Sequence, residues 1–460
     1  MLNNIINIIS IIILIIFAFP LLKNRYGPLI FCFYIAQLQS VVSVFYIEQG
    51  IFITEQNVFS FSTGATYRLV FYNIVFFTGL LSFLIIKRKS KTLFLESLPK
   101  IRELDFVSNK YVLFILIAYS LIFSLLFFMD SALLYKNYKG LYNKFDVNDF
   151  LILAKYLPRI IYYYLPSINI FILGFLFTIV IGRKLKSTII ISFLLYFISF
   201  ILQGEKFSAL YSSILLFFIP LFLRHTIRLN KKNVFNTSIL LISFCLVVLF
   251  LSINEYRSNY HFNTKEALSF VVYRIFALQG HVWWGTDLLS NNLTDVERTN
   301  QFYKELSSLI YGPSDVNNIG MQKLMIELGG NIGWQYLNNG VTFTMAFPAI
   351  ILYICDYFMS IPVLLFLGFL QGVTIYYFAQ FIHKGSLGFC IIFLKLYLDS
   401  IQAFTMGNLF VLFNKLNYLL VLILFALIIV FKIVGELSKK SIKQKRLYDD
   451  HILFTKNDAI

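Results

Sequence analysis

Charged residues are scarce in this sequence. They make up 13% of the 460 residues, whereas hydrophobic residues make up 58%, and the mean hydropathy is +0.76. A soluble globular domain carries about 25% charged residues, so the composition excludes that class. It indicates a polytopic membrane protein.

Cysteine and histidine are also rare, and their positions exclude several kinds of site. The four cysteines are Cys32, Cys245, Cys355 and Cys390. All of them fall in apolar runs, which excludes a disulfide framework and a CxxC metal site. The five histidines show no HxxxH or HxH spacing, and the sequence has no GxxxxGK[ST] phosphate loop and no GxSxG turn. We therefore expect no metal and no cofactor.

Two acidic pairs have the spacing of a cation site, and the first, Glu103 and Asp105, lies in the predicted cytoplasmic loop after the third span. Asp295 and Glu297 are separated by one residue, but they lie beside Arg298 and have no third acidic ligand nearby. The pattern favours a solvated loop over a metal site.

Apolar runs of about twenty residues recur along the whole chain. Such a run crosses a hydrocarbon core of about 30 Å, and in lipid it must be helical because no water satisfies an open backbone. The predicted spans are 5–22, 28–47, 69–86, 111–129, 161–182, 188–202, 207–223, 238–253, 342–357, 361–382, 389–404 and 418–434. The predicted fold class is an all-α polytopic membrane protein.

Lysine and arginine gather on one side of these spans, which sets the orientation. The basic segments are 23–25, 87–91, 183–186, 224–232 and 439–446. Cytoplasmic loops are enriched in these residues, so we expect the N-terminus outside. The predicted regions are N-terminal helices (1–253), a large periplasmic loop between the eighth and ninth spans (254–341), C-terminal helices (342–434) and a basic cytoplasmic tail (435–460).

The last helices leave the span count at 11 or 12. Two apolar runs lie between residues 385 and 434, although parity with a cytoplasmic tail allows one crossing there. Because Lys395 and Asp399 interrupt the run 389–404, we interpret that run as re-entrant or as a half-helix lining a cavity. This interpretation favours 11 crossings.

The net charge of +16 follows from the same topology. Most of the surplus lies in the cytoplasmic segments, where the insertion rule and attraction to anionic lipid both predict it. We therefore expect membrane lipid, and no nucleic acid, as a partner.

Several polar residues are predicted at the outer membrane face. Glu205 and Lys206 lie in a tight turn between two spans, and Arg257 follows the eighth span. A guanidinium offers a planar fork of donors that suits a phosphate. The alternatives are an interfacial hairpin whose lysine reaches lipid phosphate, and an arginine that pairs with Glu255 or anchors to lipid.

The segment YRIFALQGHVWWGTDLL, residues 273–289, is the richest part of the loop. Arg274 and His281 are seven apart, so one helix face carries both if the helix continues through Gly280. Gln279 lies between them. Trp283 and Trp284 suit stacking on a sugar ring, and the alternative is an anchor at headgroup level.

Glu327 is the remaining candidate in the loop. It lies four residues after Lys323 and just before a Gly-Gly break. The spacing is typical of a surface ion pair on an amphipathic helix, and a catalytic carboxylate is the alternative.

Together these features resemble the Wzy-type O-antigen or capsule repeat-unit polymerases. The features are many spans, one large periplasmic loop in the second half, the outer turn Gly204 to Lys206, and the arginines Arg257 and Arg274. Some members carry an arginine followed, after ten residues, by glycine, as in Arg274 to Gly285. A second copy expected in an earlier loop is missing.

The resemblance implies a GT-C-like bacterial inner-membrane enzyme that needs no metal. It would move a growing glycan from undecaprenyl diphosphate onto a new lipid-linked repeat unit at the periplasmic face, and a chain-length regulator would be a further partner. Arg274 and Arg257 would stabilise the leaving diphosphate with help from Lys206, and Glu327 or His281 would act as base. Glu205, Gln279, Trp283 and Trp284 would contact the substrate.

Two other functions fit the same sequence features. An O-antigen ligase uses the same kind of lipid-linked donor and differs in its acceptor. A lipid-linked oligosaccharide flippase or another transporter would use intramembrane charges such as Lys395 and Asp399. The absence of an evident internal repeat argues against transport.

Overall fold

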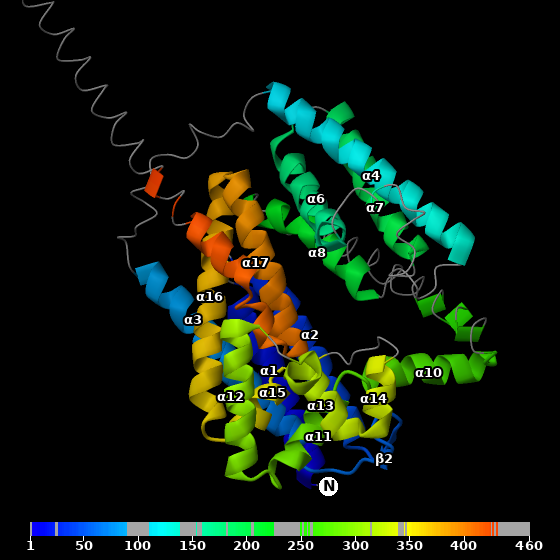
Figure 1. The fold of residues 1–460 in the computed structure, drawn as a ribbon, viewed down its shortest axis with the longest axis vertical. Coiled ribbons are helices and arrows are strands. Elements are labelled where there is room, and N and C mark those ends of the chain that lie inside the picture. Colours follow the sequence, from blue (N-terminus) through cyan, green and yellow to red (C-terminus); the bar gives the residue numbers. More distant parts are fainter. Residues whose placement is uncertain are drawn as a thin grey trace, which may run out of the picture.

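The protein is almost entirely helical (Figure 1). The computed structural model describes residues 2–23, 26–89, 110–138, 153, 159–180, 183–203, 207–224, 249–250, 253–254, 256–257, 261–312, 315–338, 345, 347–424, 426 and 429–430. The longer helices are α1 (Leu2–Leu22), α2 (Gly27–Ile47), α3 (Ala65–Lys89), α4 (Lys110–Tyr138), α6 (Arg159–Ile179), α7 (Arg183–Leu202), α8 (Phe207–Arg224), α16 (Ser360–Lys384) and α17 (Leu387–Met406).

Shorter elements connect and cover these helices at one end. They are β1 (Phe52–Ile53), β2 (Val58–Phe59), α10 (Thr264–Phe276), α11 (His281–Ser290), α12 (Asp295–Tyr311), η3 (Val316–Asn318), α13 (Gly320–Gly329), α14 (Asn331–Asn338), α15 (Ala349–Ile354) and η4 (Leu409–Val411). The strands β1 and β2 form an antiparallel hairpin, with Phe52 opposite Phe59.

Seven of the described helices are long and apolar enough to cross a membrane: α1, α2, α3, α4, α7, α16 and α17. Three shorter apolar helices cover 164–179, 212–224 and 409–424. This agrees with the predicted all-α multi-pass membrane protein. Most of the expected span 238–253 lies outside the described residues.

Two predicted spans differ from the structure. The run 342–357 contains only the six-residue helix α15, whose residues are all buried against the rest of the protein. Its apolar composition therefore reflects packing inside the protein. The run 389–404 belongs to α17, an uninterrupted helix of 20 residues, so the expected half-helix is wrong.

Helices α3 and α16 pack closely because glycine lies at their contact. A Cβ on Gly79 would lie 2.1 Å from the carbonyl oxygen of Leu365, and one on Gly368 would lie 2.0 Å from that of Phe76. Small residues allow such backbone approach between membrane helices. This contact sets the position of α16 along α3.

The short elements gather at the lower end of the bundle in Figure 1, together with the starts of α3 and α16. We call the described residues of 48–68 and 256–359 the loop end. Glu48 joins its parts, because its carboxylate accepts hydrogen bonds from the backbone N–H of Thr63 (2.7 Å), Ala65 (3.0 Å) and Thr66 (3.2 Å). A carboxylate is favourable at a helix N-terminus, so Glu48 caps α3. Its Oε2 also accepts from Asn7 of α1 at 2.8 Å.

Candidate functional site

The chain between α10 and α11 docks directly on α2. Ser43 donates to the carbonyl of Ala277 at 3.0 Å, and Ser40 donates to that of Gln279 at 3.3 Å. A Cβ on Gly280 would lie 2.5 Å from the backbone nitrogen of Val44. Only glycine fits this approach.

This docking corrects one prediction about the loop. Residues 277–280 form turns between α10 and α11, so the helix does not continue through Gly280. Arg274 and His281 therefore do not share a helix face. Arg274 is half-buried in the last turn of α10, and His281 is buried at the start of α11.

Arg274 lies among aromatic rings. Its guanidinium carbon is 5.7 Å from the ring centre of Phe270 and 6.0 Å from that of Tyr256. Arginine stacks favourably on such faces. Tyr256 also packs on Phe270, with ring centres 5.0 Å apart, and the next residue in the chain, Arg257, is exposed.

Two other arginines at the loop end are held by contacts within the protein. Arg68 forms an ion pair with Asp287. Arg298 donates to the carbonyls of Leu352 (2.7 Å), Cys355 (2.8 Å) and Ser290 (2.6 Å). Within the described ranges, by contrast, no carboxylate forms an ion pair with Arg257 or Arg274.

A carboxylate that the sequence analysis did not single out contacts Tyr273, the residue before Arg274. The hydroxyl of Tyr273 donates to Oε2 of Glu55, and Thr54 donates to the same oxygen at 2.9 Å. Glu55 is 6% exposed. Burial, and then the charge of Glu55, raises the pKa of Tyr273, so this phenol stays protonated and acts as a donor. The only sequence signal was an acidic residue in the short segment between α2 and α3.

His281 is enclosed and held in one tautomer. Its Nδ1 lies 2.8 Å from the carbonyl oxygen of Leu278, so Nδ1 carries the proton. Gln56 donates to the carbonyl of His281 at 2.9 Å. Burial lowers the pKa of His281 from 6.5, against a smaller opposing effect of Glu55. The side chain has 0% exposure, so His281 is shielded from any substrate at the surface and the predicted role as base is not supported by its position.

The lowered pKa of His281 predicts a pH-dependent stability. The unfolded chain takes up this proton at a higher pH than the folded protein, so the stabilisation is fully present above 6.5 and is lost as the pH falls through 6.5 toward the folded value. We expect the midpoint of thermal unfolding to drop more between pH 7.5 and 5.5 in the wild type than in His281→Gln. Equal drops in both proteins would contradict this prediction.

The two tryptophans are part of the core. Trp283 and Trp284 are 1% and 2% exposed. Their Nε1 atoms donate to the carbonyls of Ala65 (2.8 Å) and Phe61 (3.1 Å). Both indoles therefore fasten α11 to the start of α3, which corrects the expectation that they stack on a sugar or lie at headgroup level. Gln279 is half-buried in the docked turn.

Glu327 forms an ion pair with Lys323 on α13. The ion pair predicted from their spacing is thus confirmed, and this carboxylate is exposed. Glu205 and Lys206 lie outside the described residues. The structure thus packs Arg274 on the neighbour of Arg257, pairs Glu327 with Lys323 and buries His281.

The ion pair between Arg68 and Asp287 joins two helices at the loop end. Arg68 Nε lies 2.8 Å from Oδ1 of Asp287, and Nη2 lies 2.5 Å from Oδ2. Asp287 is fully buried. The Tyr357 hydroxyl donates to the backbone carbonyl of Asp287 at 3.1 Å. The pair joins α3 to α11, and no spacing in the sequence relates two residues 219 positions apart.

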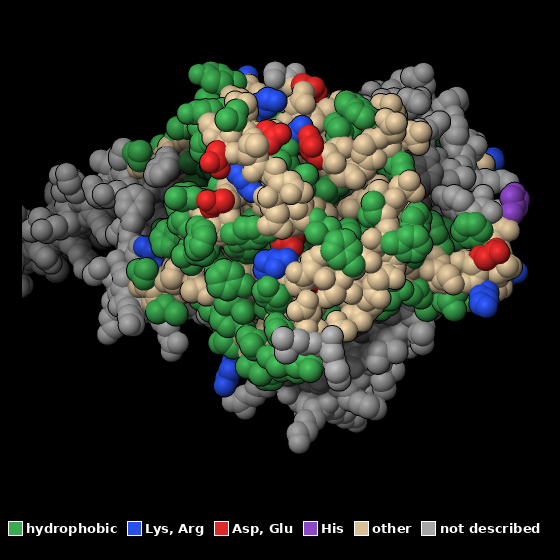
Figure 2. All heavy atoms as spheres, turned by 90° about the horizontal axis from the view of Figure 1, so that it is seen from below, with side chains coloured by type: hydrophobic (Ala, Val, Ile, Leu, Met, Phe, Trp, Pro, Cys, Tyr) green, Lys and Arg blue, Asp and Glu red, His purple; other side chains and the backbone are tan. Residues whose placement is uncertain are grey.

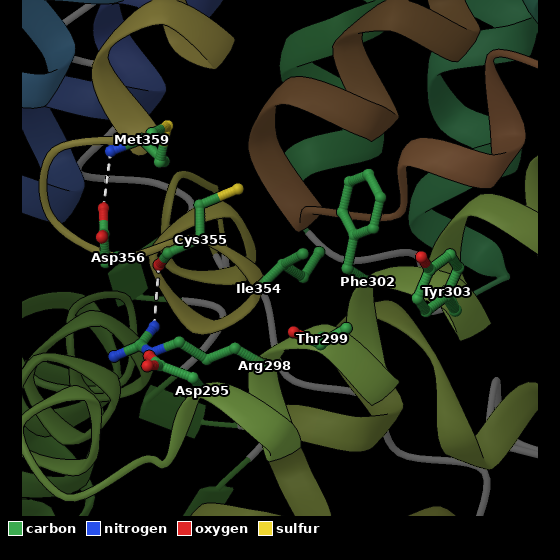
Figure 3. A pocket seen from close by; sticks show the side chains of 9 residues that line it. All are labelled: Asp295, Arg298, Thr299, Phe302, Tyr303, Ile354, Cys355, Asp356 and Met359. Atoms are coloured by element: carbon green, nitrogen blue, oxygen red, sulfur yellow. Dashed lines mark hydrogen bonds between the residues drawn. The ribbon is translucent and has the colours of Figure 1, made fainter.

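A cavity of about 310 Å³ lies between α12 and the turn before α16 (Figure 3). Arg298 crosses one side of it and reaches the carbonyl of Cys355. The cavity is lined by Asp295, Arg298, Thr299, Phe302, Tyr303, Ile354, Cys355, Asp356 and Met359. Polar and apolar residues both contribute to this lining.

The acidic pair at the start of α12 has a structural role. Glu297 and Thr294 form a capping box, in which the Glu297 side chain accepts from the Thr294 N–H at 2.9 Å. The predicted solvated loop is therefore the first turn of a helix. Throughout the described part of the chain, no group of three or more His, Cys, Asp or Glu side chains is placed to hold a metal ion.

The surface of the loop end carries both signs of charge. Figure 2 shows Lys and Arg side chains interspersed with Asp and Glu, with hydrophobic side chains between them. A patch of one sign does not dominate this face. Any anion site on this face is therefore local.

Residues 314–422 match a family of unknown function, DUF6418. No curated protein and no solved structure matches the chain. The matched region contains α13 to α17, and among the predicted site residues it includes only Glu327.

Proposed function

We propose that the protein polymerises undecaprenyl-diphosphate-linked oligosaccharide repeat units at the outer face of the bacterial inner membrane. The proposal rests on a difference between the arginines at the loop end, since only some of them are held by ion pairs or hydrogen bonds within the protein. Arg68 and Arg298 are fixed by structural contacts. Arg274 packs on Tyr256, the neighbour of Arg257 in the chain, and neither Arg257 nor Arg274 has a carboxylate partner in an ion pair among the described residues. Such a pair suits a diphosphate.

The corrected helices support an outer location for this pair. If residues 342–357 do not cross, three predicted crossings follow the loop end: α16, α17 and the predicted span 418–434. With the eight spans that the sequence predicts before it, the total would be 11 and the basic tail cytoplasmic. This count removes the parity conflict found in the sequence and supports a periplasmic loop end.

In the proposed reaction, an acceptor hydroxyl attacks the anomeric carbon of the donor glycan. The bond between that carbon and the diphosphate oxygen breaks, and the diphosphate leaves with the electron pair. Arg274 and Arg257, assisted by Lys206, stabilise the developing negative charge. The hydroxyl proton passes to a carboxylate, and we propose Glu55 for this role in place of His281 and Glu327, because Glu55 accepts a hydrogen bond from Tyr273, the residue before Arg274.

A deletion strain tests this function directly. Its surface polysaccharide is separated on a gel beside that of the same strain complemented with the wild-type gene. A single band of core plus one repeat unit in the deletion, with the full ladder restored by complementation, is the expected result. An unchanged ladder would remove the protein from polysaccharide assembly, and bare core would indicate the ligase.

A specific observation favours transport as the second candidate. Lys395 and Asp399 form a buried ion pair of 2.5 Å near the middle of α17. Asn417 donates to Asp399 at 2.7 Å, and Lys395 Nζ lies 4.4 Å from the ring centre of Tyr164 in α6. Buried charges in a span often mark a transport path. A deletion strain that accumulates lipid-linked units on the cytoplasmic face would support this candidate.

A further inference from the structure

We propose that α12, although it lies in the polar loop, embeds one face in the outer leaflet of the bilayer. On this helix several apolar side chains are exposed and several polar side chains are buried. Its exposed apolar residues include Tyr303 (63%), Leu306 (39%) and Ile310 (57%). These positions are three and four apart, so they form one stripe along the helix.

The opposite pattern holds on the buried face of α12. Gln301, Glu305 and Ser308 also share a face by their spacing, and they are 3%, 6% and 4% exposed. Polar side chains thus point into the protein while apolar side chains point away from it. In a protein surrounded by water this arrangement would be reversed.

Hydrogen bonds fix this orientation. Glu305 accepts from the backbone N–H of Gly320 at 2.6 Å, and Gln301 donates to the carbonyl of Asn318 at 3.0 Å. Turning the helix to bury Tyr303 and Ile310 would break both contacts. The stripe is therefore held outward by the polar face behind it.

The position of the apolar stripe next to a candidate membrane helix indicates that lipid covers it. Phe302 and Tyr303 line the cavity together with Met359, which immediately precedes α16. Met359 is 62% exposed, and Phe366, farther along α16, is 60% exposed. The stripe therefore adjoins the apolar surface of a candidate span, and Figure 1 shows α12 running roughly parallel to that bundle. A lipid surface covers both without a second partner.

A third face of α12 supplies a matched control. Asn300, Lys304 and Ser307 are exposed and polar, and they are again spaced by four and three. If the apolar stripe faces acyl chains, this polar face is expected to face water or headgroups. Two faces of one helix should then report different surroundings.

Site-directed spin labelling in lipid nanodiscs tests this proposal. Single cysteines at 303, 306 and 310, and at the control positions 300, 304 and 307, are labelled in a background whose four cysteines are replaced by alanine. We expect the ratio of oxygen to nickel-chelate collision rates to be higher at the first three positions than at the controls. Equal ratios would show that water covers the stripe. Protection from both reagents would show that a protein covers it, and either result overturns the proposal.

A second measurement keeps the native cysteines. Tyr303→Trp and Lys304→Trp are compared in vesicles that contain lipids with brominated acyl chains. Quenching beyond that of the three native tryptophans is expected for Tyr303→Trp and not for Lys304→Trp. Equal additional quenching in the two variants would contradict the embedding of α12.

Discussion

Arg274→Ala is expected to abolish long-chain polysaccharide while the protein remains in the membrane at its normal level. The guanidinium touches aromatic rings and, in the described part of the chain, forms no ion pair, so its loss should affect substrate more than folding. Removing one preorganised donor from a developing negative charge typically slows a reaction by about 10²–10³. The gel ladder of the complemented deletion strain measures this loss.

Two further variants separate geometry from charge. Arg274→Lys should restore little polymer, because an ammonium lacks the planar fork that binds two phosphate oxygens. Lys265→Ala removes an exposed cation from the first turn of the same helix, and its ladder should match the wild type. A normal ladder from Arg274→Ala would exclude this arginine from the site.

Arg68→Ala is expected to lower the free energy of unfolding by about 3–5 kcal/mol, because it leaves a buried carboxylate without its partner. The Asp287 side chain is 1% exposed and that of Arg68 is 25% exposed, so solvent screens the pair only weakly. Thermal unfolding in detergent, followed by the emission of the nearby buried tryptophans, reports the loss.

A double variant identifies the cause of that loss. Arg68→Ala combined with Asp287→Asn removes the unpaired charge, so it should be more stable than Arg68→Ala alone. Lys304→Ala, at an exposed position, should change stability little. A double variant less stable than Arg68→Ala would mean that the pair does not act through charge burial.

Composition and run length predicted the helical class and most of the long helices correctly, because each span must satisfy its own backbone bonds. They misplaced the run 342–357, since an apolar segment buried in protein and one that faces lipid have the same composition. The length of the helix distinguishes the two cases. Helix α15 ends at Ile354, and residues Cys355 to Met359 separate it from α16.

The candidate site shows a different limit. The aromatic neighbours of Arg274 lie within its own stretch of chain, so they were within reach of sequence reasoning. The contacts of Glu55 with Tyr273 and of Arg68 with Asp287 join residues more than 200 positions apart. The burial of Trp283 and Trp284 follows from the same long-range docking, because indole nitrogens of α11 bind carbonyls at the start of α3.

The separation of Arg68 and Asp287 along the sequence has a consequence for biosynthesis. Glu48 reaches the start of α3 within 18 residues, so the cap can form as soon as α3 is inserted. Arg68 must wait for Asp287, which is 219 residues later. At about 5–20 residues per second, the ribosome needs roughly 10–45 s to supply that partner. During this interval the arginine stands at the membrane surface without its carboxylate, and the loop end is completed only as the last helices emerge.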